Sequence, residues 1–294
     1  MQKPMRVLAI AALAAFSATA VQAAPIVVGG KGFTEQLLLS EITAQLLTHE
    51  GFEVEKRDGL GSQVVRDAQV NGQIDVYWEY TGTSLVTFNK VSDRLTAEET
   101  YARVSELDAE VGLTWLDPSR TNNTYAVAVR GSDEKTDAMV TVSDMAQAYN
   151  DGANLTMAMS TEFPGRPDGL PGLEATYDFK TSRAQRRAMD PGLVFPTLRD
   201  GHTDIGLVTG TDGRIPAFNF RILEDDKGFF PNYAAVPVVR TEVLEANPEL
   251  AAPLNAMSAV LTDEIMRALN AQVDIDNAPI SDVATQFLTE NGLI

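Results

Sequence analysis

Residues 26–55 read IVVGGKGFTEQLLLSEITAQLLTHEGFEVE, and this stretch decides the fold class. Its first three residues are a short apolar run, which predicts a buried strand ending at a Gly-Gly pair. Thr34 then opens a helix with one apolar side, and Gly51 ends it. Residues 52–55 alternate apolar and charged side chains, which indicates a second strand. A strand, a helix and a second strand in this order predict a parallel sheet covered by helices.

The rest of the chain continues this alternation and restarts it once. The further predicted elements are a helix from Ser62 to Gly72, a strand at 74–77, a helix from Thr96 to Gly112, strands at 125–129, 155–159 and 204–208, a helix from Ser143, a largely helical stretch at 183–199 and a mostly helical tail from Thr241. The restart at Tyr125 indicates a second unit of the same kind. We therefore predict two α/β lobes and a helical tail.

The composition excludes several classes of partner and site. The chain has 294 residues, and 41 acidic against 23 basic residues give it a net charge of −18. This charge argues against nucleic acid and anionic membrane surfaces as partners. The chain has no cysteine, which excludes disulfides, thiolate metal sites and a cysteine nucleophile.

Residues 1–23 have the pattern of a cleavable signal peptide. Lys3 and Arg6 precede an apolar run from Val7 to Ala18 that is too short to span a bilayer. Small residues follow, and we expect cleavage after Ala23. The mature protein should then be soluble and periplasmic. An uncleaved N-terminal membrane anchor is the alternative.

Polar or glycine-bearing loops follow four of the predicted strands, at 31–36, 78–83, 160–163 and 209–213. In open α/β sheets, ligands bind beyond the carboxyl ends of the strands, so two facing lobes would bring these loops to one cleft. Three tyrosines, Tyr80, Tyr125 and Tyr233, lie at the edges of predicted segments. Tyrosines placed in this way suit a cation–π cage for a quaternary ammonium group, and packing in the core is the alternative for each.

No catalytic or metal-binding pattern is visible in the sequence. His49 and His202 are the only histidines, and each has the context of a solvated surface residue. The Gly-x-Ser-x-Gly and HExxH motifs are absent, and the acidic run at 224–226 lacks the spacing of a calcium loop. We therefore predict no catalytic residue, no metal ion and no cofactor. An exported enzyme on the same two-lobed fold is the alternative from a different class.

Four motifs carry a resemblance to a known family: GKGFTEQ at 30–36, YWEYTGT at 77–83, TDGRI at 211–215 and LEDDKGFFP at 223–231. With these motifs in this order, the chain resembles the osmoprotectant-binding proteins of ABC importers over nearly all of its mature length. That family binds glycine betaine, choline, carnitine and related compounds. Within it, the chain is most similar to the Gram-negative periplasmic branch, which includes the low-affinity osmoprotectant importer of enteric bacteria.

The resemblance implies an α/β periplasmic binding protein of the type II-like class, with a ligand cleft between two lobes joined by two hinge strands. Lobe I would comprise residues 24–125 and 233–294, and lobe II residues 126–232. The implied partners are a small quaternary ammonium compound or related zwitterion and an ABC permease in the inner membrane. We expect a monomer that binds no nucleic acid. Presentation of the ligand to a membrane receptor is a further alternative.

The resemblance also implies which residues bind the ligand. Tyr80, Tyr125 and Tyr233 fall on cage positions, and Gln36 and Thr83 fall on polar positions of the first lobe. The remaining cage position holds Thr209 instead of an aromatic residue. Loss of one ring–cation contact costs about 0.5–2 kcal/mol. The departure therefore leaves a sulfonium compound, an amino acid or another zwitterion as an alternative ligand.

Two phenylalanines and several donors complete the expected site. Phe163 or Phe218 could compensate for the missing ring at position 209. The amides that open the helix near Phe33 and Thr34 are candidate donors for a ligand carboxylate, because helix N-termini favour anions. Lys31 and Arg166 are further candidates, and Asp212 is expected to cap a turn.

Overall fold

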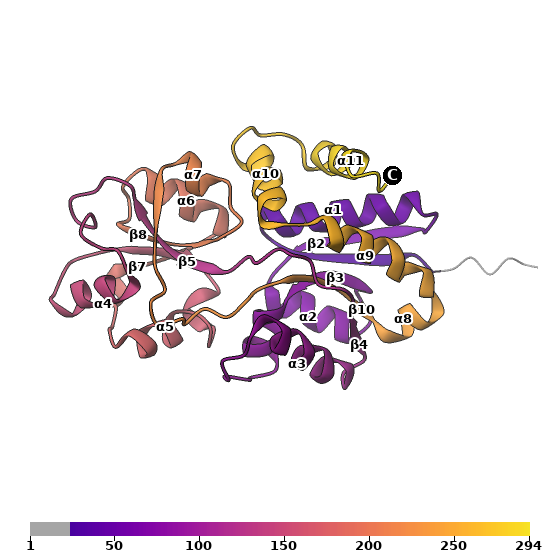
Figure 1. Ribbon diagram of the computed structural model, residues 1–294, viewed down its shortest axis with the longest axis horizontal. Helices are drawn as coiled ribbons and strands as arrows, with labels where there is room; N and C mark the ends of the chain where they lie inside the picture. The colour runs from indigo at the N-terminus through magenta and orange to yellow at the C-terminus, as the bar shows by residue number, and fades with distance from the viewer. Residues whose placement is uncertain (1–23) are drawn as a thin grey trace, which may run out of the picture.

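A computed structural model describes residues 24–294, and the predicted signal peptide at 1–23 lies outside the described residues. The chain forms two α/β lobes, each built on a five-stranded sheet (Figure 1). The first lobe contains the first and last parts of residues 24–294, and the second lobe contains the part between them. The predicted two-lobed fold is therefore confirmed.

The first lobe is built on a mixed sheet with the strand order β2-β1-β3-β10-β4. Its strands are β1 (Ile26–Lys31), β2 (Val54–Leu60), β3 (Val76–Tyr80), β4 (Leu113–Trp115) and β10 (Ala235–Arg240). The first three strands are parallel, as predicted, and β10 runs antiparallel to both of its neighbours. The third strand extends further than predicted, so Tyr80 is its last residue and not a loop residue.

Helices cover both faces of this sheet. They are α1 (Thr34–His49), α2 (Ser62–Val70), α3 (Ala97–Ala109), α8 (Thr241–Ala246), α9 (Ala251–Val260), α10 (Asp263–Asp274) and α11 (Ile280–Glu290), with a π-helical turn at Thr83–Phe88. One core joins Leu38 and Ile42 of α1 to Met257 of α9, Met266 of α10 and Phe287 of α11. The predicted helical tail thus packs on the first lobe, where it buries its apolar faces.

The second lobe has the strand order β7-β6-β8-β5-β9. Its elements are β5 (Tyr125–Arg130), α4 (Val142–Asn150), β6 (Met157–Ser160), α5 (Leu170–Tyr177), β7 (Arg186–Met189), α6 (Pro191–Arg199), β8 (Ile205–Thr209), α7 (Arg214–Ala217) and β9 (Phe220–Leu223), with 3₁₀ turns at Phe163–Gly165 and Arg183–Gln185. Strands β6, β7 and β8 are parallel, and β5 is antiparallel to β8 and β9.

The prediction of one helical stretch at 183–199 is wrong in its first half. Residues 186–189 form the edge strand β7, which pairs in parallel with β6. Pro191 is the first residue of α6, a position that needs no backbone N–H. The ring of a proline also forces the preceding residue out of the helical conformation, so Asp190 separates a strand from a helix.

The chain crosses between the lobes twice, and the two crossings lie side by side. Asn122 forms an isolated antiparallel bridge with Ala234, and the Asn123 amide donates to the Tyr233 carbonyl over 3.1 Å. The amide of Tyr233 in turn donates to Asn122 Oδ1 over 2.8 Å. These paired crossings connect β4 to β5 and β9 to β10. They fit the predicted pair of hinge strands.

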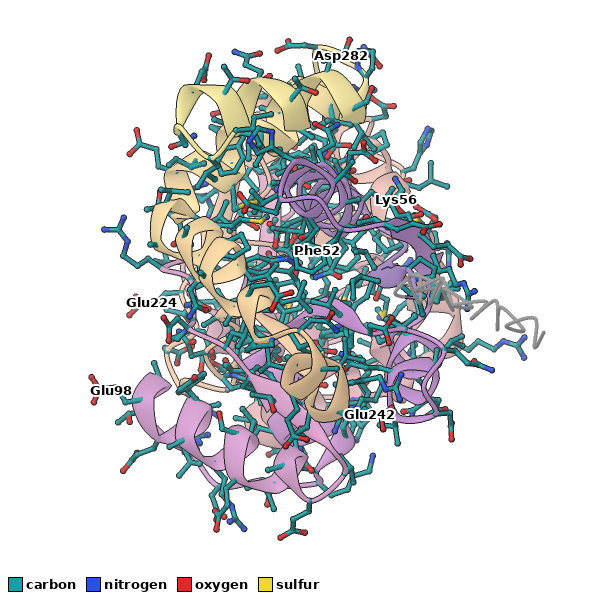
Figure 2. All side chains as sticks on the ribbon, turned by 90° about the vertical axis from the view of Figure 1, so that its right-hand side faces the viewer. Phe52, Lys56, Glu98, Glu224, Glu242 and Asp282 are labelled. Atoms are coloured by element: carbon teal, nitrogen blue, oxygen red, sulfur yellow. The ribbon has the colours of Figure 1, made fainter. Side chains whose placement is uncertain are left out.

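Acidic side chains are prominent on the outside of the first lobe. Figure 2 shows Glu98, Glu242 and Asp282 pointing away from α3, α8 and α11. Within residues 24–294, none of the helices has both the length and the apolar character needed to cross a membrane.

Candidate functional site

A cavity of about 630 Å³ lies between the two lobes. Its walls come from the carboxyl ends of β1 and β3 in the first lobe and of β6 and β8 in the second. These are the four loop positions at which the sequence predicted a cleft, and that part of the prediction is confirmed. Ends of parallel strands form such sites because neighbouring loops diverge there and leave space for a ligand.

Three tyrosines converge on this cavity from different parts of the chain. Tyr80 ends β3, Tyr125 begins β5 and Tyr233 lies on the return crossing. The rings of Tyr125 and Tyr233 meet edge to face, with centroids 5.6 Å apart and an interplanar angle of 87°. Phe33 lies next to Tyr80, with ring centroids 6.2 Å apart. All four aromatic residues line the cavity.

Hydrogen bonds on the far ends of two rings fix their orientation. The Tyr80 hydroxyl donates to Glu35 Oε1 over 2.7 Å, and the Tyr233 hydroxyl donates to Asp168 Oδ2 over 2.8 Å. Burial raises the pKa of both hydroxyls, so both rings stay neutral. Tyr125 is held by packing, with Phe163 at 5.1 Å between ring centroids. The three rings are therefore presented to the cavity in fixed positions.

Glu35 is a buried carboxylate at the base of the cavity, in the first turn of α1. It accepts hydrogen bonds from Tyr80, from Asn123 Nδ2 at 2.9 Å, from Asn270 Nδ2 at 3.2 Å and from the Thr211 hydroxyl. Burial raises the pKa of Glu35, and these hydrogen bonds oppose the rise. Glu35 thus connects Tyr80 to the interlobe crossing at Asn123, to α10 and to the second lobe.

Two buried cations lie beside the tyrosines. Lys31 Nζ is 2.5 Å from Glu79 Oε1 and 5.0 Å from the centroid of the Tyr80 ring. The Arg166 guanidinium pairs with Asp168 and donates from Nη2 to the Thr83 hydroxyl over 3.2 Å. Its Nη1 lies 3.9 Å from Glu162 Oε2, beyond hydrogen-bond distance, so this nitrogen keeps its N–H groups for another acceptor.

Six of the eight residues predicted to bind the ligand line the cavity. They are Phe33, Tyr80, Thr83, Tyr125, Thr209 and Tyr233. Gln36 does not: its amide donates to the Trp78 carbonyl over 2.8 Å and its oxygen accepts from the Lys31 amide, so its polar atoms serve the fold. Phe163 does not line it either, because it is fully buried behind Tyr125.

Thr209 stands where the resemblance implies an aromatic residue. It is the last residue of β8, and the register of the β5–β8 pair places it directly opposite Tyr125. Phe218 does not replace the missing ring, because it packs against Phe220 and Arg199 away from the cavity. Asp212 accepts from the Arg214 amide over 2.9 Å, as expected for a turn-capping residue, and also lines the cavity.

The sequence analysis missed several residues of the cavity wall. Glu35, Asn123 and Asn270 line the cavity and were not singled out. Together with Thr211, which does not line it, they form one hydrogen-bonded cluster. Glu35 lies in the motif at 30–36 and Thr211 opens the motif at 211–215, and these two positions were the available signals. Asn270 lies in the helical tail, and no local pattern links residues so far apart in the sequence.

The two lobes touch around the cavity. On one side, the Ser62 amide of α2 donates to Glu162 Oε1 of the second lobe over 2.9 Å. On the other side, Arg214 Nη2 lies 3.1 Å from Asp274 Oδ2 of α10. In Figure 1, α7 of the second lobe and α10 of the first lobe face each other. Because the lobes contact each other on both sides of the cavity, the structure shows them closed over it.

Comparison with known proteins agrees with this architecture. The family model for the substrate binding domain of the ABC-type glycine betaine transport system matches residues 24–290. A glycine-betaine-binding protein of Pseudomonas aeruginosa is 42% identical over 300 residues, covering 100% of this chain and 96% of that protein. The glycine betaine-binding protein YehZ of Escherichia coli is 32% identical, covering 95% of each chain.

A solved structure shows the same fold. The crystal structure of a glycine betaine/carnitine/choline ABC transporter protein superposes with a TM-score of 0.71 at 28% identity, covering 91% of this chain and 99% of that one. The family match spans nearly all of the described residues, and the cavity lies where the two lobes of this fold meet. The chain belongs to the family of substrate-binding proteins of ABC-type glycine betaine transport systems.

Proposed function

We propose that this protein binds a small quaternary ammonium solute of the glycine betaine class in the periplasm and delivers it to an ABC permease. The observation that carries the proposal is the convergence of Tyr80, Tyr125 and Tyr233 on one cavity between the lobes. The names of the relatives from Pseudomonas aeruginosa and Escherichia coli support the choice of ligand.

The chemistry of the cavity suits a trimethylammonium group. Such a group has no N–H to donate, so it is held by ring faces and by dispersion against its methyl groups rather than by a paired carboxylate. The rings of Tyr80, Tyr125 and Tyr233 provide these faces, and their buried hydroxyls stay protonated. The Glu35 side chain behind Tyr80 fixes the orientation of that ring through the hydrogen bond from the Tyr80 hydroxyl.

A ligand carboxylate finds donors on the other side of the same cavity. Arg166 Nη1 has N–H groups free for it, and the Thr83 hydroxyl lies next to that guanidinium. The start of α1, at Phe33 and Thr34, also lines the cavity, and helix N-termini favour anions. A zwitterion therefore meets aromatic faces at its cationic end and donors at its anionic end.

Binding would couple to closure of the lobes. Tyr80 and Thr83 belong to the first lobe and Arg166 to the second, so a ligand that contacts both sets stabilises the closed form. The closed, loaded protein would then be the form that the permease recognises. We infer that the protein works as a monomer, because each chain carries both walls of the cavity.

The threonine at position 209 favours an alternative ligand for the same kind of binding protein. With one wall of the cage lacking a ring, a sulfonium compound or another small zwitterion could bind as well as a trimethylammonium compound. A role as an enzyme is less well supported, because the cavity wall contains no histidine, cysteine or other evident nucleophile–base pair.

Calorimetric titration tests the proposal directly. The mature protein should bind glycine betaine, choline, carnitine or dimethylsulfoniopropionate with one-to-one stoichiometry, and the bound compound should be recovered unchanged. Thermal stabilisation by the same compound provides an independent readout. Absence of heat and of stabilisation with all four compounds would refute the proposed ligand class. A bound compound that is chemically altered would instead indicate an enzyme.

A further inference from the structure

A buried ion pair outside the ligand cavity contacts the π-helical turn at Thr83–Phe88. Asp108, near the end of α3, is fully buried, and its carboxylate accepts from the Arg66 guanidinium of α2 over 2.9 and 2.6 Å. Neither residue lines the cavity. Burial of such a pair costs desolvation, and apolar side chains of the same volume often stabilise a fold as well. Fixing the geometry of a neighbouring segment is the other role for which such a pair is retained.

Both ends of the turn converge on this pair. The Ser84 hydroxyl donates to Asp108 Oδ2 over 3.0 Å, and Asn89 Nδ2 donates to Asp108 Oδ1 over 2.9 Å. The Arg66 guanidinium lies 5.3 Å from the centroid of the Phe88 ring. Asp108 and Arg66, which we name the anchor pair, thus contact the second residue of the turn, its last residue and the residue that follows it.

Asn89 both closes the turn and connects it to the anchor pair. Its backbone amide donates to the Ser84 carbonyl over 2.9 Å, which is the five-residue spacing of a π-helix, and its Nδ2 donates to the same carbonyl over 3.1 Å. Turns of this type are rare and occur frequently at functional sites. Without the Asn89 side chain, the turn loses one hydrogen bond to Asp108 and one of two to the Ser84 carbonyl.

Two threonines of the same turn contact the second lobe. The Thr83 hydroxyl accepts from Arg166 Nη2 over 3.2 Å, and the Thr87 hydroxyl donates to Asp168 Oδ1 over 3.1 Å. Thr83 also lines the cavity. A hydroxyl that accepts from a cation keeps its hydrogen for another acceptor, so Thr83 can donate to a ligand carboxylate. The backbone of the turn decides where this hydroxyl lies.

We propose that Asp108 is a positioning residue for ligand binding. Through Arg66, Ser84 and Asn89 it holds the turn in its π-helical form, and this form places the Thr83 hydroxyl at the carboxylate end of the ligand. A turn released from the anchor pair relaxes toward α-helical spacing, which rotates its side chains about the helix axis. This inference rests on the proposed function, because it assumes a ligand with a carboxylate in the cavity.

A double-mutant cycle tests this role. Asp108→Asn leaves the buried Arg66 without its anionic partner and should lower the melting temperature strongly. The cycle therefore uses Asn89→Ala, which keeps the anchor pair, together with Thr83→Val. Titration is carried out with glycine betaine, carnitine and dimethylsulfoniopropionate, each of which has a carboxylate.

The two single variants should act on the same contact. Asn89→Ala should weaken binding of the tightest of the three compounds by about three- to tenfold, and Thr83→Val by about tenfold or more. The double variant should bind no more than about twofold more weakly than Thr83→Val alone, because independent sites give additive effects and coupled sites do not.

Asn71→Ala is the matched control. Asn71 directly follows α2 in the same lobe, and its Nδ2 donates to the Asp67 carbonyl over 2.8 Å, but it is exposed and does not line the cavity. It should bind the compound as the wild type does. Equal weakening by Asn71→Ala and Asn89→Ala would mean that a general loss of stability lowers the affinity, and it would overturn the positioning role.

Two further results would overturn the positioning role and leave the proposed function standing. One is wild-type affinity in Asn89→Ala. The other is losses that multiply in the double variant, because Asn89 would then act on binding independently of Thr83. Binding of choline but of none of the three carboxylates would have the same meaning. No binding of any of the four compounds by the wild type would refute the proposed function and the positioning role together.

Discussion

The hydroxyl of Tyr80 lies 2.7 Å from Glu35 Oε1, and the same carboxylate accepts a hydrogen bond from Thr211 of the opposite lobe. One ring of the cage is thereby tied to a contact between the two lobes. Tyr80 therefore has two separable parts: the ring, which faces the cavity, and the hydroxyl, which positions that ring.

Replacement of Tyr80 should separate these two parts. Tyr80→Ala removes the ring and should weaken ligand binding at least tenfold, an effect of about 1.4 kcal/mol or more and within the range of a desolvated cation–π contact. Tyr80→Phe keeps the ring and should weaken binding less. Calorimetric titration measures both. His202→Ala changes an exposed residue far from the cavity and should bind as the wild type does. Normal binding by Tyr80→Ala would refute the cage.

Glu35 should make the stability of the protein depend on pH in a defined direction. Burial raises the pKa of Glu35 in the folded protein above its ordinary value of 4.5. Between the two values, the folded state holds a proton that the unfolded state has lost. The free energy of unfolding therefore falls as the pH rises through this window, and below it Glu35 contributes no pH dependence.

The matched variant Glu35→Gln cannot titrate, so it isolates this contribution. Urea denaturation of both proteins from about pH 4 to pH 8 follows the free energy of unfolding upward from the ordinary glutamate pKa. The stability of the wild type relative to Glu35→Gln should decrease as the pH rises. A relative stability that increases with pH would mean that the hydrogen bonds outweigh burial and that the pKa of Glu35 is lowered.

Much of the fold follows from local sequence, because buried strands and amphipathic helices each leave a periodic pattern. The capping box of Thr96 and Glu99 begins α3 where the sequence predicts it. β7 escaped prediction because an edge strand buries little and Arg186–Met189 has no alternating apolar pattern. β10 is an apolar run with one proline, and its antiparallel pairing with β3 has no local signal because it depends on residues more than 150 positions away.

The residues of the cavity wall that lie in or beside sequence motifs could be predicted. The residues that the fold brings in from distant parts of the chain could not. Tyr80, Thr83 and Tyr233 lie in or beside motifs, and the structure places all three on the wall. Gln36 lies in a motif too, but it follows Glu35 directly in the helix. Its side chain therefore points in another direction and hydrogen-bonds to the Trp78 carbonyl. Asn270 reaches Glu35 only because α10 packs over α1, which no local signal reports.

Gly82 should be required for the position of Tyr233. A Cβ atom added at Gly82 would lie 2.9 Å from two atoms of the Tyr233 ring and 2.7 Å from the Asn232 carbonyl oxygen. These distances are too short for real contacts, and the backbone carbonyl cannot move freely. Gly82→Ala should therefore displace the ring and weaken ligand binding by about two- to thirtyfold, the value of one ring–cation contact.

Gly165→Ala is the matched control, because nothing lies within 4 Å of a Cβ atom at that position. It should bind the ligand as the wild type does. Crystallography or the near-ultraviolet circular dichroism of the tyrosines would report the displacement in Gly82→Ala. Wild-type affinity in Gly82→Ala would show that Tyr233 does not contribute a ring face to the ligand.

Glu162 should stabilise the closed form of the protein. Its Oε1 accepts from the Ser62 amide over 2.9 Å, and this amide opens α2 in the opposite lobe. Gly61, the residue before α2, has no side chain to cap the helix. Glu162 thus supplies from the second lobe both the missing cap and a negative charge at a helix N-terminus. The interaction is lost when the lobes separate.

Glu162→Ala should weaken ligand binding by about two- to fivefold, because a carboxylate at a helix N-terminus contributes about 0.3–1 kcal/mol. Glu162→Gln keeps an acceptor and should lose less. Glu245→Ala, at an exposed position of α8, is the control for removal of one negative charge. Small-angle X-ray scattering of the ligand-free proteins should show a larger radius of gyration only for the Glu162 variants. Weaker binding with no change in the radius of gyration would mean that Glu162 acts on the ligand itself, through Arg166, and not on closure.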